Sequence, residues 1–202
     1  MAVNNSVKPR GIWLWPLAIL IMVISFLGYA IVFFQQGYQE EGIRQAIRLS
    51  ARFSVVLFSI AFAGSGIHQY FPNSFTYWIF RNRKFFGICF AFNHLIHLLF
   101  LFILQKEFHP VFDLANGFSL MAGGIAYLFI VLMLLTSFSF FEKMISWKNW
   151  KRLHTVGGYW IWTVFMSSNI KRVFRGEWSY TPVVVLLIIV LLFRFWKWRQ
   201  EK

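Results

Sequence analysis

The chain alternates between long apolar runs and short polar connections. The apolar runs cover residues 12–34, 50–69, 85–104, 118–141, 153–170 and 181–196. Each run approaches the roughly 20 residues that an α-helix needs to cross a hydrocarbon core of about 30 Å. The pattern therefore predicts an all-α fold, an integral membrane bundle of about six transmembrane helices.

The polar segments between these runs are too short to bury an aqueous core of their own, so residues 1–202 are predicted to form one transmembrane domain. The stretch 35–48 is expected to connect the first two helices, and Pro72 with Asn73 to close the second one. Lys8 and Arg10 precede the first run as they do in a signal peptide, but this run is too long for such a segment. It is predicted to be a retained helix.

Composition and charge agree with a membrane protein. Only 13% of the residues are charged, against about a quarter in soluble domains. The net charge of +13 raises the question of nucleic acid, but the basic residues form short clusters between apolar runs, which argues against that partner. Cys89 lies inside an apolar run and indicates neither a disulfide framework nor a cysteine metal site. The many Phe and Trp side chains are expected to face lipid or fill the core.

The basic clusters predict an orientation. Four of them fall on the same side of a bundle with about six spans. They comprise Lys8 and Arg10, then Arg81, Arg83 and Lys84, then Lys143, Lys148, Lys151 and Arg152, and finally Arg194, Lys197, Arg199 and Lys202. The bias of Lys and Arg toward the cytoplasm places the N- and C-termini there. The opposite side holds most of the acidic residues but also several basic ones, so the bias is clear without being complete.

Histidines inside the apolar runs are the candidate chemistry, because an ionisable side chain in hydrocarbon is costly. They are His68, His94, His97 and His154. His94 falls near the midplane and His97 one turn further along the same helix, whereas His68 and His154 fall at the cytoplasmic edge. Neutral imidazole is a good haem ligand. The alternative is that each histidine only hydrogen-bonds a neighbouring helix.

Three stretches carry a resemblance to a known family. Arg83-Lys84-Phe85-Phe86-Gly87 is followed ten residues later by His97, Thr136-Ser137 ends the fourth run, and Trp150-Lys151-Arg152-Leu153-His154 opens the fifth. Over about residues 50–170 the chain resembles the ferric reductase-like transmembrane domain family, and in particular the haem-binding membrane subunit of the bacterial periplasmic methionine sulfoxide reductase system. The resemblance implies haem b bound by His97 and His154.

The ligand set departs from that family at one position. The family carries a second histidine on the fifth helix, predicted here over residues 153–170. This chain has Ser167 at that position, and a hydroxyl is a poor haem ligand. Three alternatives stay open: Met166 ligates in its place, His68 and His154 hold a haem between them, or the haem is five-coordinate or absent. His94 is a further candidate ligand.

The resemblance implies a function. The chain is expected to be a membrane b-type cytochrome, an oxidoreductase subunit of the bacterial inner (plasma) membrane. It would pass electrons from a cytoplasmic-side donor to an outer acceptor. No stretch is long enough for a nucleotide-binding domain, so the electron source is expected to be a partner redox protein, quinol or a larger membrane complex. The competing hypotheses are a haem-free diverged subunit that scaffolds a larger complex, and a transporter or proton path using His94 and His97.

Overall fold

The computed structural model describes residues 14–109 and 117–200, and these residues are almost entirely helical. The α-helices are α1 (Leu14–Gln36), α2 (Glu40–Tyr70), α3 (Ser74–Phe108), α4 (Gly117–Leu135), α5 (Ser139–Glu142), α6 (Trp147–Phe174) and α7 (Thr181–Gln200), and the short 3-10 helix η3 (Trp178–Tyr180) precedes α7. No strand occurs in this part of the chain. The predicted all-α fold is confirmed. Ile12 and Trp13 of the predicted first helix, Lys8, Arg10 and Lys202 lie outside the described residues.

Within residues 14–109 and 117–200, four segments are long and apolar enough to cross a membrane. They are Trp15–Gln36, Glu40–Tyr70, Ser74–Phe108 and Trp178–Trp196. The apolar described part of α4, Leu120–Leu135, is shorter, and α6 has the length but carries polar side chains along it. The prediction of a membrane bundle is therefore confirmed in its coarse form, but only four of the six predicted spans meet both criteria.

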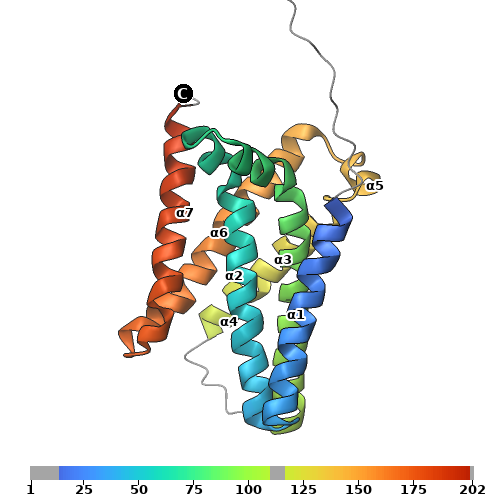
Figure 1. Ribbon diagram of the computed structural model, residues 1–202, viewed down its shortest axis with the longest axis vertical. Coiled ribbons are helices and arrows are strands. Elements are labelled where there is room, and N and C mark those ends of the chain that lie inside the picture. Colours follow the sequence, from blue (N-terminus) through green and yellow to red (C-terminus); the bar gives the residue numbers. More distant parts are fainter. Residues whose placement is uncertain (1–13, 110–116, 201–202) are drawn as a thin grey trace, which may run out of the picture.

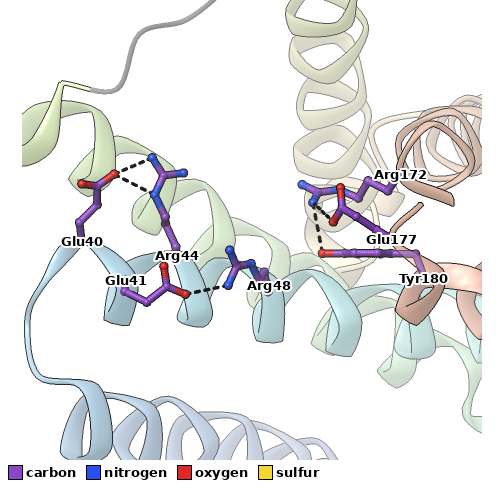
Figure 2. Close-up of polar contacts among 7 residues, drawn as sticks. All are labelled: Glu40, Glu41, Arg44, Arg48, Arg172, Glu177 and Tyr180. Atoms are coloured by element: carbon purple, nitrogen blue, oxygen red, sulfur yellow. Dashed lines mark hydrogen bonds and ion pairs between the residues drawn. The ribbon is translucent and has the colours of Figure 1, made fainter. Parts of the chain in front are cut away.

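α2 begins at Glu40, ten residues before the predicted start at Ser50. The charged residues that looked like a connection pair along the helix surface instead. Arg44 lies 2.6 Å from Glu40, and Arg48 lies 2.8 Å from Glu41 (Figure 2). Such pairs stabilise a helix where its charges reach water, so the polar stretch continues the helix rather than ending it.

α3 likewise begins at Ser74 rather than at residue 85. Asn73, which was expected to close the preceding helix, caps this one. Its side chain accepts from the Thr76 amide at 2.9 Å, and the Thr76 hydroxyl accepts from the Asn73 amide at 3.1 Å. This reciprocal capping box satisfies amides at the helix start. Arg81 and Lys84, predicted in a loop, lie on α3.

The remaining boundaries also shift. α4 ends at Leu135 instead of residue 141, and the short α5 follows it. α6 begins at Trp147 because the Ser146 side chain caps it, accepting from the Asn149 amide. α6 then runs to Phe174, four residues beyond its predicted end, and α7 starts at Thr181 as predicted.

The antiparallel helices α2 and α3 form the centre of the bundle (Figure 1). α1 packs on both of them, α7 packs on α2, and α6 crosses between α7 and α4 (Figure 1). The main apolar core draws side chains from α2, α3 and α6, including Phe58, Phe90 and Phe165. On α1, large side chains such as Phe26 and Leu27 stay exposed, as expected where a helix faces lipid.

The bundle has two distinct ends (Figure 1). The start of α1, the α2–α3 connection, α5 and the end of α7 lie together at what we call the α5 end. The α1–α2 connection, the end of α3 and η3 lie toward the opposite one, the η3 end. The basic clusters around Arg81, Lys148 and Arg199 therefore share the α5 end, which is the grouping that their spacing predicted.

Candidate functional site

His94 and His97 form a stacked pair in the middle of the bundle. Both lie on α3, and their rings are 5.0 Å apart and inclined by 10°. Residues three apart project from the same side of a helix, so the expected proximity of the two rings is confirmed. Both rings come from the same helix and stack nearly in parallel. They therefore do not face each other from opposite sides of a single metal ion.

Two groups on α2 hold the His97 ring. Its Nδ1 atom lies 3.1 Å from the carbonyl oxygen of Ile47 and 3.0 Å from the hydroxyl of Ser50. A carbonyl oxygen only accepts, so this Nδ1 carries the proton and Nε2 keeps its lone pair. In the described part of the chain, no hydrogen bond occupies Nε2. Histidines that bind metals are oriented in this way, through a hydrogen bond from the other nitrogen.

His94 is enclosed by aromatic rings from three helices. Tyr127 of α4 stacks on it at 5.1 Å, Phe165 of α6 meets it edge-on at 5.2 Å, and Phe90 of α3 stacks at 5.6 Å. The His94 Nδ1 atom and the Tyr127 hydroxyl are both buried, and neither has a hydrogen-bond partner among the described residues. Buried polar atoms are normally satisfied, so these two atoms are exceptions among the described residues.

A hydrogen-bond network lies behind His97. The fully buried Asn93 donates to the carbonyl of Ser50 at 2.9 Å and to the hydroxyl of Ser54 at 2.8 Å, and its oxygen accepts from the Tyr29 hydroxyl. The network ties α1, α2 and α3 together at the level of His97. Sequence reasoning missed Ser50, Ser54 and Tyr29 as partners, although the two serines lie four residues apart and so share a helix face.

His154 is engaged at the α5 end. The Thr136 hydroxyl donates to the Leu132 carbonyl at 2.8 Å and lies 3.1 Å from His154 Nε2, so it accepts from an Nε2–H group there. Trp150 stacks on His154 at 4.1 Å and donates to the Thr136 carbonyl at 3.0 Å. Two of the three stretches that carry the family resemblance thus contact each other. Because Nε2 carries the proton, Nδ1 is the nitrogen of His154 that keeps a lone pair.

His68 serves the α2–α3 connection. Its Nδ1 lies 3.0 Å from the Thr76 hydroxyl, and its ring stacks on Phe80 at 5.6 Å. No contact joins His68 and His154 within residues 14–109 and 117–200, so the structure does not bring together the pair that one of the sequence alternatives required. Its contacts are those of a histidine that fixes a turn.

Neither of the two α6 positions considered for a second ligand, Ser167 and Met166, has a contact with His97 in the described structure. Ser167 is exposed and donates to the Val164 carbonyl at 3.0 Å. Met166 is half-buried and packs against the apolar core. The α6 side chain that reaches the histidine pair is Phe165, which has no donor atom for a metal.

Two of the predicted ligands keep a nitrogen without a hydrogen bond among the described residues, His97 through Nε2 and His154 through Nδ1. Were a haem present, His97 could hold its iron through Nε2, because Nδ1 is engaged by the Ile47 carbonyl. No group of three or more His, Cys, Asp or Glu side chains that could hold a metal ion occurs in the described residues, and the α6 side chain that contacts the histidine pair is Phe165. The residues present therefore suit a group held mainly through His97.

The fold and the site together define a helical membrane protein with a buried histidine pair backed by a polar network. No protein-family model matches the chain, and no characterised protein matches it at a significant level. What the protein does must therefore be inferred from the site.

Proposed function

We propose that this protein is a membrane b-type cytochrome-like electron-transfer subunit, with His97 as the haem ligand. The observation that carries the proposal is the contact of His97 Nδ1 with the Ile47 carbonyl and the Ser50 hydroxyl on α2, which assigns the proton to Nδ1. This arrangement fixes the ring and leaves Nε2 free to bind iron. When bound, haem supplies the one-electron chemistry, and the bundle sets its ligation and excludes water.

The family resemblance supports the same proposal. The Thr136 and Trp150 elements, which both carry the resemblance, contact each other through His154. The grouping of basic clusters at the α5 end supports a cytoplasmic position for that end in a bacterial inner membrane. A donor on that side, either quinol or a redox protein, would then deliver electrons toward an acceptor at the η3 end.

The experiment is an absorbance spectrum of the detergent-purified protein, expressed with haem supplied, before and after dithionite reduction. We expect a Soret band that shifts on reduction, its loss in His97→Ala, and a weaker or shifted band in Ser50→Ala. His68→Ala is the matched control, because it removes a histidine that fixes a turn. A featureless visible spectrum from the folded wild-type protein, or a band unaffected by His97→Ala, would refute the proposal.

A second candidate function is a haem-free subunit that stabilises a larger membrane complex. The observation that favours it is Phe165, which closes the site from α6 and packs edge-on against His94 at 5.2 Å. In this alternative the histidine pair is a packing element. His97→Ala would then lower the stability of the bundle in the absence of any spectral signal, and the protein would co-purify with partner subunits from its native membrane.

A further inference from the structure

A pocket of about 320 Å³ lies between α1 and α2, apart from the histidine pair. It is lined by Val32 of α1 and by Gln45, Arg48, Leu49 and Arg52 of α2. The four α2 residues follow a spacing of three, four and seven, which places them on a single face of the helix. The pocket thus combines two guanidinium groups with two aliphatic walls.

The pocket lies at the boundary between the apolar and polar parts of the bundle. Val32 belongs to the last turns of the apolar segment Trp15–Gln36. The guanidinium of Arg52 lies 5.6 Å from the ring centre of Tyr180, in the first turn of the segment Trp178–Trp196. Tyrosine is typical of membrane–water interfaces. The pocket is therefore at the depth where lipid headgroups meet acyl chains.

The charges of this region are unequally compensated. At the η3 end, ion pairs join Arg44 to Glu40, Arg48 to Glu41 and Arg172 to Glu177, as Figure 2 shows. Arg52 is different, because in the described part of the chain no carboxylate lies within ion-pair distance of it. Its interaction there is with the Tyr180 ring, which Arg172 also approaches, at 4.8 Å from the ring centre. One pocket wall thus carries a positive charge without an acidic partner.

We infer that this pocket binds an anionic phospholipid, with the phosphate between Arg48 and Arg52 and an acyl chain against Val32 and Leu49. Guanidinium groups bind phosphate through paired N–H donors, and basic pockets between transmembrane helices hold anionic headgroups. A free phosphate ion would use the same donors but would gain nothing from the aliphatic walls. The inference is independent of haem binding.

The test is native mass spectrometry of the full chain released from detergent with added phosphatidylglycerol or phosphatidylcholine at equal concentration. We expect the wild-type protein to retain phosphatidylglycerol selectively. Arg52→Gln should weaken that retention about fivefold, since one basic residue near a membrane surface contributes about 1 kcal/mol. Arg44→Gln is the matched control, because it makes the same change on the same helix but outside the pocket.

Two further measurements separate the sources of the anion. Val32→Trp fills the apolar wall without changing charge, and we expect it to reduce retention of phosphatidylglycerol as well. Inorganic phosphate in large excess should displace little of the bound lipid, whereas full displacement would identify a headgroup-sized ion as the ligand and overturn the inference. Equal retention of both lipids, or equal loss in Arg44→Gln and Arg52→Gln, would also overturn it.

Circular dichroism establishes that each variant is folded, and Arg52→Lys, which keeps the charge, should retain most of the lipid.

Discussion

Two tyrosines with buried hydroxyl groups allow the polar network to be tested by one chemical change with different expected effects on stability. The Tyr29 hydroxyl donates to Asn93, whereas the buried Tyr127 hydroxyl has no hydrogen-bond partner among the described residues. Replacing each tyrosine by phenylalanine removes one hydroxyl and leaves the ring packing in place. Any general effect of losing a hydroxyl in a membrane bundle is therefore common to both variants.

The magnitudes follow from the contacts. Hydrogen bonds between transmembrane helices contribute about 0.6 kcal/mol on average and at most about 1.7, so Tyr29→Phe should lower the free energy of unfolding by that amount. An unsatisfied buried hydroxyl costs about 1 kcal/mol or more, so Tyr127→Phe should leave stability unchanged or raise it. We expect the two variants to differ by at least about 0.6 kcal/mol, with Tyr29→Phe the less stable.

The assay is reversible unfolding of the haem-free protein in mixed micelles with an increasing fraction of sodium dodecyl sulfate, followed by circular dichroism. The reasoning is refuted if both variants shift the midpoint by the same amount in the same direction. Repeating the measurement on haem-loaded protein adds information about the site. Destabilisation by Tyr127→Phe in that form alone would show that the hydroxyl gains a partner when the site is filled.

Two other predictions use the contacts between helices. A Cβ atom on Gly66 would lie 2.5 Å from the backbone oxygen of Phe193, so Gly66→Ala should push α7 away from α2 and cost about 1–3 kcal/mol. A Cβ atom on Gly124 would meet nothing within 4 Å, so Gly124→Ala should be neutral or stabilising by up to about 1 kcal/mol. An equal loss of unfolding free energy in both variants would contradict this. Trp150→Phe keeps the aromatic stack but removes the 3.0 Å hydrogen bond to Thr136, and thermal unfolding should show a loss of about 0.6 kcal/mol.

Helix positions were predictable from apolarity, but helix ends were not. The spans at the centre of α2 and α3 follow from continuous apolar runs, which lipid requires. Both helices extend about ten residues beyond those runs, because Glu40 and Glu41 pair with arginines on the helix surface and Asn73 forms a capping box with Thr76. Charged residues and Asn are typical of connections, so the same residues indicate either a loop or a solvated helix end until their partners are known.

The candidate site was predictable only within one helix. The spacing of His94 and His97 places their rings together because it depends on helix geometry alone. The residues that hold or enclose them come from other helices, and helix rotation decides which side chain is presented. On α6, that rotation turns Phe165 toward the pair and leaves Ser167 exposed. The comparison with the family pointed to position 167 on α6. It therefore could not identify Phe165 as the α6 side chain that reaches the histidine pair.

Helix α6 is held in the bundle by contacts with its neighbours, although it is less apolar than the other long helices. It has 28 residues but is not among the described segments that meet the criteria for a span. Three of its indole groups donate to backbone carbonyls of the segments around it. Trp150 donates to Thr136, Trp160 to Ala122 of α4 at 3.1 Å, and Trp162 to Leu187 of α7 at 2.9 Å. These tryptophans were expected only to fill space or face lipid. Ala122 and Leu187 lie within helices, and because a helical carbonyl keeps a second lone pair, these two bonds do not break the helices that accept them. α6 is therefore held by its neighbours, and its place beside the histidine pair depends on α4 and α7 being folded around it.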